Sequence, residues 1–205
     1  MRLAVYLEKA GSGILQDTQG ELSDEAILIQ KAKDFDSEAW AQIYRRHYPK
    51  IYAYLRYRVG DIDLAEDITA NVFLHAVEGI GSFTYRGFSI SAWLFRIAHN
   101  QVTDHLRRKA KVAIEPLTEE LLSTEDTGQE TMEGALVRAE LSLALKNITE
   151  EQRQVVLLKF FAGLSNAEVA RIIRKPEGAV KALQHRALAS LRQILGTEEK
   201  NEERL

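Results

Sequence analysis

Apolar residues recur at three- and four-residue steps along most of the 205-residue chain, which is the period of a helix that buries one face. Residues that break helices are few, with 12 Gly and 3 Pro. Hydrophobic residues make up 45% of the chain, which is enough to bury one or two small cores. The pattern therefore predicts an all-α protein.

The clearest segment runs from 164 to 195 and predicts two short helices separated by Lys175-Pro176-Glu177. Ser165, with Glu168 three residues later, has the sequence of a capping box that begins a helix. Pro176 disfavours the helical conformation at the residue before it, so the first helix is expected to end there. This spacing is typical of a helix-turn-helix.

The second of these helices separates apolar from basic residues. One stripe is expected to be buried, and its residues are Val180, Leu183, Ala187, Leu188, Leu191, Ile194 and Leu195. Lys181, His185 and Arg186 lie off that stripe, where a helix in the major groove reaches base edges and phosphates. The alternative is a helical bundle with a solvated basic face. The pattern favours binding of duplex DNA.

The N-terminal part of the chain predicts a mobile extension, 1–22, followed by helices. Ser23 or Asp24 is expected to begin the first helix, with Ile27, Leu28 and Ala32 facing inward. Asp36 or Ser37 is expected to begin the second. Its predicted core stripe is Trp40, Ile43, Tyr44, Tyr48, Ile51, Tyr52, Leu55 and Val59. Pro49 lies inside this helix and predicts a kink or a break.

A third helix follows Gly60 and places four polar residues on the outer side of its first turns. These are Asp63, Glu66, Asp67 and Asn71. Acidic residues in the first turn oppose the positive end of the helix dipole, which is explanation enough for the carboxylates. The functional alternative is an acidic docking face for a basic partner.

The segment 81–91 is rich in glycine, serine and aromatic residues and predicts an exposed loop. Ser91 is expected to begin the next helix, which ends in a basic cluster: Arg107, Arg108, Lys109 and Lys111. Bases at a helix C-terminus complement its dipole, so the cluster alone proves nothing. An aromatic loop that leads into a basic helix is, however, what single-stranded DNA requires, because rings stack on bases and cations bind phosphates.

Charge divides the rest of the chain, whose net charge is −3. Seven acids and no Lys or Arg lie between Val112 and Val137, and we interpret 112–134 as an acidic linker between two helical domains, 23–111 and 135–196. Thr149 and Gln152 form a second potential capping box, and 197–205 is expected to be a frayed charged tail. The start of the chain is neither a signal peptide nor a membrane span, because Glu8 and Lys9 interrupt its apolar run. We expect a cytoplasmic protein.

Four runs, in this order and spacing, resemble bacterial sigma factors of the sigma-70 family, extracytoplasmic-function (ECF) type. They are DLAEDITANVFLHA, SAWLFRIAHNQVTDHLRR, TEEQRQVVLLKFFAGLSNAEVARII and KPEGAVKALQHRA, and the similarity spans about residues 23–195. The resemblance implies that 23–111 is sigma region 2 and 135–196 is sigma region 4. It implies a transcription initiation factor whose partners are RNA polymerase core, through its β′ and β subunits, and promoter DNA. An anti-sigma factor is a further candidate partner.

The resemblance also implies three sets of contact residues. Core polymerase would be bound by Asp63, Glu66, Asp67 and Asn71. The minus-ten promoter element would be melted and bound by Phe83, Tyr85, Arg86, Phe88, Ser89, Trp93, Arg96, Asn100, Arg107 and Arg108. The minus-thirty-five element would be read by Lys159, Asn166, Gly178, Lys181, Ala182, His185 and Arg186. The turn of the helix-turn-helix departs from the family, which typically has Gly where this chain has Arg174.

Two other classes of protein are compatible with parts of the sequence. A stand-alone helix-turn-helix regulator would bind a palindrome as a dimer, and would leave the acidic helix and the aromatic loop unexplained. An enzyme is less well supported. The five histidines form no ligand pair at helical spacing and are expected on helix surfaces or rims, and Cys is absent. We therefore expect no catalytic residue, no metal and no cofactor.

Overall fold

The computed structural model describes residues 18–84, 88–112 and 132–202, and every regular element within these ranges is a helix. This confirms the all-α prediction. The N-terminal unit consists of α2 (Thr18–Lys33), α3 (Ser37–Val59), α4 (Ile62–Gly79), the 3₁₀ turn η1 (Ile80–Ser82) and α5 (Ile90–Val112). The C-terminal unit consists of α6 (Met132–Lys146), α7 (Glu150–Val156), the π-helical turn η2 (Leu157–Phe161), α8 (Asn166–Ile173) and α9 (Glu177–Glu202).

The ends of the chain and most of the acidic linker lie outside the described residues. Several helix boundaries differ from the prediction, and α6 begins at Met132, inside the predicted linker. Helix α2 begins at Thr18, so neither Ser23 nor Asp24 begins it, and α9 continues to Glu202, through part of the segment that was expected to fray. Among the described residues, no helix has the length and apolar character needed to cross a bilayer.

Short polar side chains begin the helices of the N-terminal unit. An Asp36 carboxylate oxygen accepts from the Ala39 N–H at 2.7 Å, and Asp61 accepts from the Leu64 N–H at 2.8 Å. Gly60 ends α3 with a φ of 79°, a left-handed conformation that favours glycine. In α2, Ile29 and Ala32 are buried whereas Ile27 is 54% exposed. The prediction for Ile27 was wrong because the buried face of α2 is turned toward Ile29.

Helix α3 continues through Pro49 without a break. Both halves are anchored in the core, because Ile43 lies before the proline and Ile51 and Leu55 after it, all fully buried. Pro49 itself is exposed, so water can reach the backbone group that it leaves unpaired. Tyr44 was predicted in the core but is 46% exposed, and its ring lies 4.8 Å from that of Phe73. The stripe of tyrosines therefore forms the rim of the core.

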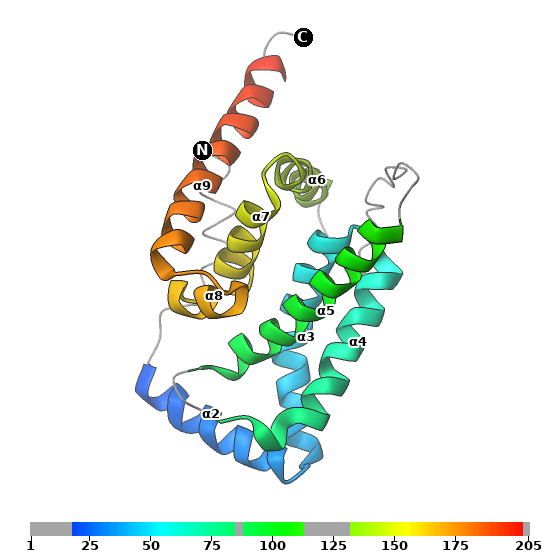
Figure 1. Cartoon of the computed structure of the whole chain (residues 1–205), viewed down its shortest axis with the longest axis vertical. Helices are drawn as coiled ribbons and strands as arrows, with labels where there is room; N and C mark the ends of the chain where they lie inside the picture. The colour runs from blue at the N-terminus through cyan, green and yellow to red at the C-terminus, as the bar shows by residue number, and fades with distance from the viewer. Residues whose placement is uncertain (1–17, 85–87, 113–131, 203–205) are drawn as a thin grey trace.

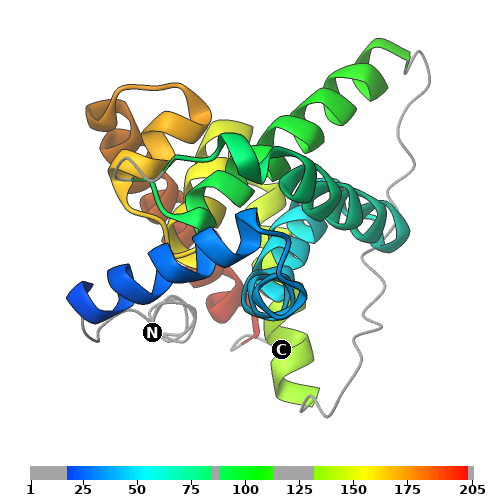
Figure 2. The ribbon, with the colours of Figure 1, turned by 90° about the horizontal axis from the view of Figure 1, so that it is seen from below.

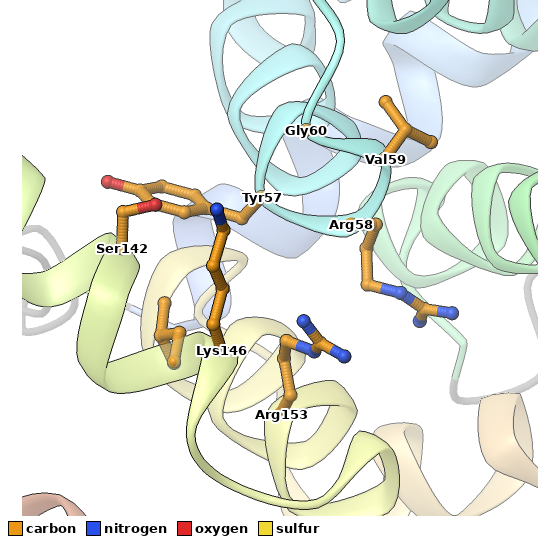
Figure 3. Close-up of a pocket in the computed structure, with 8 residues that line it drawn as sticks. Tyr57, Arg58, Val59, Gly60, Ser142, Lys146 and Arg153 are labelled. Carbon is orange, nitrogen blue, oxygen red and sulfur yellow. The ribbon is translucent and has the colours of Figure 1, made fainter. Parts of the chain in front are cut away.

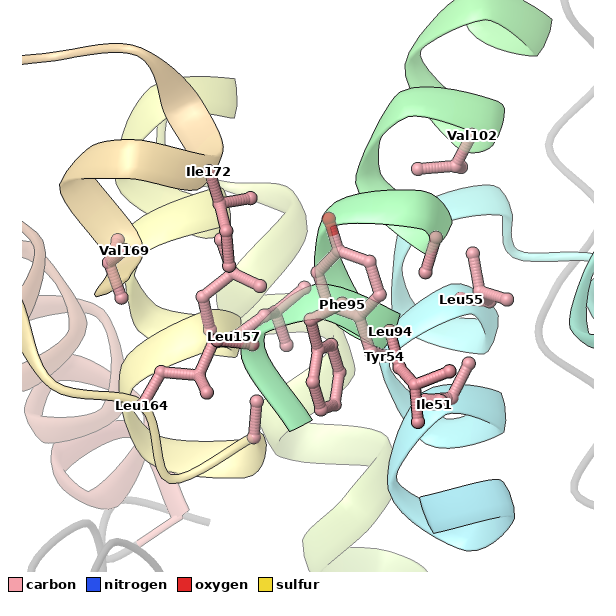
Figure 4. Close-up of a cluster of buried hydrophobic side chains, with 14 of the residues drawn as sticks. Ile51, Tyr54, Leu55, Leu94, Phe95, Val102, Leu157, Leu164, Val169 and Ile172 are labelled. Carbon is pink, nitrogen blue, oxygen red and sulfur yellow. The ribbon is translucent and has the colours of Figure 1, made fainter. Parts of the chain in front are cut away.

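The two units pack against each other (Figure 1). Helices α3, α4 and α5 lie side by side, α8 contacts α5, and η2 contacts α3. Seen from below, α2 crosses the base of the N-terminal unit (Figure 2). Figure 4 shows Tyr54 and Phe95 of the N-terminal unit facing Leu157 and Ile172 of the C-terminal unit. One apolar cluster thus extends across both units.

A chain of polar contacts crosses the same boundary beside this cluster. The Arg58 side chain is 1% exposed and forms a 2.7 Å ion pair with Glu150 of α7. Arg58 also donates to the Tyr54 hydroxyl at 3.0 Å, which lies 3.2 Å from His99 Nδ1. Since a buried guanidinium requires a partner, Glu150 fixes where the end of α3 meets α7.

A small cavity of about 90 Å³ lies at this boundary (Figure 3). Tyr57 and Arg58 line it from α3, Lys146 from α6 and Arg153 from α7. Its volume is well below the roughly 300–1,000 Å³ of small-molecule sites. This volume fits a packing gap between the two units.

Two histidines are buried, contrary to the prediction that all lie on surfaces or rims. His47 is 5% and His99 is 9% exposed. Burial, assisted by Arg46 and Lys50, lowers the pKa of His47 to about 4. Burial and then Arg58 lower the pKa of His99 to about 4, although Glu150 opposes the change. Both imidazoles are therefore neutral at neutral pH.

These two pKa values predict how stability depends on pH. Between pH 6.5 and about 4 the unfolded chain binds protons at both histidines and the folded chain does not. The contribution of these neutral histidines to the free energy of unfolding is expected to be fully present above pH 6.5 and to be lost as the pH falls from 6.5 toward about 4. Urea unfolding of wild type, His47→Gln and His99→Gln at several pH values measures this slope. Each single variant should show about half of the histidine-dependent slope, and an unchanged slope in both would contradict the assignment.

Candidate nucleic-acid interface

The predicted acidic docking residues share one exposed face of α4. Asp63, Glu66, Asp67 and Asn71 are all exposed, while the opposite face of α4 is buried. Asp61 caps the helix and Asp63 lies in its first turn, so the dipole explanation holds for these two. On the adjacent α3, burial and then the neighbouring Tyr44 and Glu66 raise the pKa of Tyr48. The exposed face thus combines carboxylates with an aromatic rim.

Two apolar residues extend this face, and sequence periodicity did not identify them. Leu74 is 55% exposed one helical turn beyond Asn71, and Tyr44 is 46% exposed on the adjacent α3. An exposed leucine beside carboxylates is compatible with docking of an amphipathic element. Leu74 follows two buried residues, Val72 and Phe73, and nothing in its residue type separates it from them.

The aromatic loop is only partly exposed. Phe83 was predicted to be exposed but is 5% exposed, because the turn η1 directs its ring against Trp93 at a centroid distance of 5.0 Å. Tyr85 and Arg86 lie outside the described residues. Phe88 and Ser89 are half-buried. In the described part of this loop, Phe88 is therefore more accessible than Phe83.

Helix α5 begins two residues earlier than expected. The Ser89 hydroxyl accepts from the Ala92 N–H at 3.1 Å, so Ser89 rather than Ser91 caps the helix. Beyond the half-buried Trp93, an exposed stripe continues along Arg96 and Asn100 to the basic end of the helix. That end includes Arg107 and Arg108. Arg107 forms an exposed ion pair with Asp104 at 3.0 Å, which is weak because water screens it.

The helix-turn-helix has the predicted boundaries. Ser165 and Glu168 form the capping box, with the Glu168 N–H to Ser165 Oγ at 3.2 Å and the Ser165 N–H to Glu168 Oε2 at 2.9 Å. Thr149 and Gln152 form the second box, at the start of α7. Arg174 ends α8 with a φ of 56°, in the left-handed region, and α9 begins at Glu177. The turn is made by an arginine in a conformation that favours glycine.

The first turns of α9 present one polar face. Gly178, Lys181, Ala182, His185 and Arg186 are all exposed, and Leu183 is buried at 6% exposed. The Lys181 ammonium forms an ion pair with Glu177 of the same helix at 3.0 Å. An exposed pair of this kind contributes little and can yield to a phosphate. The geometry therefore keeps these side chains available for a major groove.

The two remaining predicted residues, Lys159 and Asn166, lie closer to the core. The Lys159 ammonium donates to the Leu164 carbonyl at 3.1 Å, where it ties η2 to the turn before α8. Asn166 is half-buried at the start of α8. Lys159 thus has a structural contact that a phosphate would have to replace.

Sequence patterns missed three residues that contact the aromatic loop and the start of α5. Glu25 of α2 and Glu168 of α8 direct carboxylates to this region, and the Arg171 guanidinium lies over the Phe88 ring. Glu25 lies 65 positions from its hydrogen-bond partner Ile90, and Glu168 lies 79 positions from its partner Ser89. No local period connects positions so far apart.

Two family models match this chain, one in the N-terminal unit and one in the C-terminal unit. Residues 43–112 match sigma-70 region 2, and residues 138–191 match sigma-70 region 4. The ECF RNA polymerase sigma factor BldN of Streptomyces coelicolor is 37% identical over 82% of this chain, which spans 64% of that relative's length. SigM of Mycobacterium tuberculosis is 33% identical over 86% of each chain. SigW of Bacillus subtilis is 31% identical over 82% of this chain and 94% of the SigW chain.

Solved structures share the fold at lower identity. The sigma factor RpoE of Bartonella quintana, in complex with the anti-sigma factor NepR, has a TM-score of 0.65 and 23% identity, covering 80% of this chain and 98% of RpoE. CnrH, in complex with the cytosolic domain of CnrY, has a TM-score of 0.63 and 23% identity, covering 84% of this chain and 97% of CnrH. At this identity the likeness establishes the arrangement of helices.

The left-handed turn residue predicts a stabilising substitution. Arg174→Gly is expected to raise the free energy of unfolding by up to about 1 kcal/mol, because relief of the left-handed strain exceeds the added chain entropy. Ala167→Gly, at an exposed position in the first turn of α8, is the matched control and should lower the free energy of unfolding by up to about 1 kcal/mol. Urea unfolding of both variants measures the difference. Equal losses in both would show that Arg174 is unstrained.

Proposed function

The chain belongs to the sigma-70 family as an ECF sigma factor, a transcription initiation factor that directs RNA polymerase to promoters, and we propose that its two units divide this work. The observation that carries the proposal is the presence of regions 2 and 4, in that order, in one chain. A stand-alone regulator needs the helix-turn-helix alone.

The N-terminal unit would bind core polymerase through the acidic face of α4. Its exposed carboxylates are Asp63, Glu66 and Asp67, with Asn71 beside them. Carboxylates beside apolar side chains suit a basic amphipathic partner, because charge directs the encounter and apolar contact adds affinity. The partner surface would lie on the β′ and β subunits. The cytoplasm, where RNA polymerase acts, is the location that follows.

The same unit would bind the melted minus-ten element at the start of α5. Phe88 offers a ring face for a base, and Arg96, Asn100 and the basic end of α5 follow along the exposed stripe. Stacking on an aromatic ring tolerates any base, whereas side-chain amides and guanidinium groups can bind base edges and phosphates. We assign strand capture to this surface, with Tyr85 and Arg86 as further candidates.

The C-terminal unit would read the minus-thirty-five element as duplex DNA. The exposed face of α9 carries Lys181, His185 and Arg186 in its N-terminal turns, where a recognition helix contacts base edges. An anti-sigma factor is the further partner that we propose. The fold is bound by an anti-sigma factor in RpoE of Bartonella quintana.

Runoff transcription is the experiment that tests the function. The purified chain is added to bacterial core polymerase on genomic DNA fragments, and transcripts are sequenced. We expect discrete start sites that depend on the chain, with shared sequence near minus ten and minus thirty-five. A double substitution of the docking face, Glu66→Lys with Asp67→Lys, should abolish these starts while duplex binding by the chain persists. Binding to DNA without any new start would favour the stand-alone regulator.

Duplex recognition has a quantitative prediction. Lys181→Ala with Arg186→Ala should weaken binding to a minus-thirty-five duplex and lower the slope of log affinity against log salt by roughly 2, since about 0.9 counterions are released per phosphate contact. Fluorescence anisotropy at salt concentrations from about 50 to about 300 mM measures the affinity and the slope of log affinity against log salt. Arg192→Ala, an exposed residue farther along α9, is the control and should change neither value.

A further inference from the structure

Helix α2 carries a carboxylate that holds the start of α5. The N–H of Ile90, the first residue of α5, donates to Glu25 Oε1 at 3.0 Å. Glu25 is half-buried and lies outside residues 43–112, which match sigma-70 region 2. The contact therefore brings a residue from outside the matched segment to the helix that we assign to the minus-ten strand.

The Ile90 N–H needs an acceptor from outside its own helix. The first N–H groups of a helix have no partner within it, and Ile90 is only 1% exposed, so water is a poor substitute. Ser89 serves the next groups, because its hydroxyl accepts from the Ala92 N–H and its carbonyl from the Trp93 N–H, each at 3.1 Å. Glu25 serves Ile90. A buried N–H that loses its acceptor is strongly unfavourable, so loss of this carboxylate would shift the backbone here.

The backbone that Glu25 holds adjoins the exposed part of the aromatic loop. The N–H that Glu25 binds belongs to the peptide between Ser89 and Ile90, and Phe88 is the residue before this peptide. The Ser89 hydroxyl fixes the same stretch from its other side by capping α5. The direction in which the Phe88 ring points therefore depends on a backbone segment that α2 helps to hold.

Helix α2 also contacts the other end of this loop. The turn η1 packs against α2, and Ile80 of η1 is 1% exposed. The Phe83 N–H donates to the Ile80 carbonyl at 3.0 Å, and the Phe83 ring packs on Trp93 in the first turns of α5. One helix thus contacts the segment before the loop and the residue that begins the segment after it. The position of α2 bears on the spacing of the two loop ends.

Helix α2 is itself anchored on α3. Its residues Ile29 and Ala32 are buried at 5% and 0% exposed. The Trp40 indole N–H of α3 donates to the Ala32 carbonyl at 3.0 Å. A side chain on an anchored helix holds its partner within a narrow range of positions, which suits Glu25 to fixing a backbone group.

Helix α2 alone does not explain why a glutamate occupies position 25. Glu25 lies in the middle of the 16-residue helix, away from the positive end of the helix dipole. Its neighbours Asp24 and Ala26 are exposed, whereas Glu25 is half-buried. A carboxylate that is partly removed from water needs hydrogen bonds in exchange, and the Ile90 N–H supplies one.

Resting on the proposed function, we propose that Glu25 is a positioning residue for recognition of the minus-ten element. Stacking on Phe88 tolerates any base, so discrimination depends on where the stacked base lies relative to the groups that bind its edges, such as Arg96 and Asn100. Glu25 fixes the start of α5 and with it the place of that base. Without the acceptor, the loop samples several arrangements and different sequences bind more equally.

Three substitutions of Glu25 separate the hydrogen bond from the charge. Glu25→Ala removes the acceptor, and Glu25→Asp keeps the charge on a side chain that is one methylene too short. Glu25→Gln keeps an acceptor oxygen at the same reach without the charge. Asp24→Ala is the matched control, because it removes a carboxylate from the exposed neighbouring position of α2.

The measurement uses holoenzyme assembled from bacterial core polymerase and each full-length chain. The template is a promoter mapped by runoff transcription, with its own minus-ten element or with single-base changes in that element. We expect the ratio of transcription from the intact element to that from the changed elements to fall roughly threefold to tenfold in Glu25→Ala and Glu25→Asp. The ratio should keep the wild-type value in Glu25→Gln and in Asp24→Ala.

This ratio distinguishes positioning from a purely structural role. Partial unfolding lowers transcription from every template equally and leaves the ratio unchanged. Binding of each chain to the minus-thirty-five duplex, which we expect to be unaltered, shows that the C-terminal unit is folded. If Glu25→Ala does not fold, the comparison of Glu25→Asp with Glu25→Gln carries the test.

Three results would overturn the proposal. One is an unchanged ratio in Glu25→Ala and Glu25→Asp, whether or not total transcription falls, and another is a loss of discrimination in Glu25→Gln as large as that in Glu25→Asp. Either result, together with start sites that depend on the wild-type chain, would leave the sigma-factor function standing. The third is the absence of any start site that depends on the wild-type chain, which would overturn the proposed function and this inference with it.

Discussion

Burial of α5 from two directions is the constraint on which the rest of the structure depends. Helices α3 and α4 cover one side of α5, and α8 contacts it from the other unit. Leu94, Phe95, Ala98 and Val102 are all fully buried, so α5 needs apolar residues on more than one stripe. Because one helix belongs to two interfaces, the position of the second unit is coupled to the loop that leads into α5.

Polar contacts determine how the two units align. Apolar packing alone is non-directional and would permit several arrangements. The Arg58 guanidinium is buried and requires the Glu150 carboxylate, which α7 supplies from the other unit. The hydrogen bond from Ser89 to Glu168 sets the other end of the boundary. The seam between the units is thus specified at both ends by charge-assisted contacts, with apolar side chains between them.

This arrangement distributes the candidate surfaces unequally. The acidic face of α4 and the basic face of α9 lie on the outside, where a partner can reach them without any change in the fold. The start of α5 lies at the seam, in contact with α8. The start of α5 is therefore less accessible to a partner than the exposed faces of α4 and α9.

The sequence by itself determined the helices, the two capping boxes, the turn at Pro176 and the exposed faces of α4 and α9, because each depends on residues within a few positions of one another. It misjudged Phe83, His99 and Tyr44, whose burial depends on neighbours from other helices. The contacts from Glu25, Glu168 and Arg171 to the start of α5 were decided only by the tertiary structure. The period of the hydrophobic residues indicates which face of a helix is buried, but not which distant helix covers that face. The covering helix is decided by side-chain fit and paired charges between segments that are far apart in the chain.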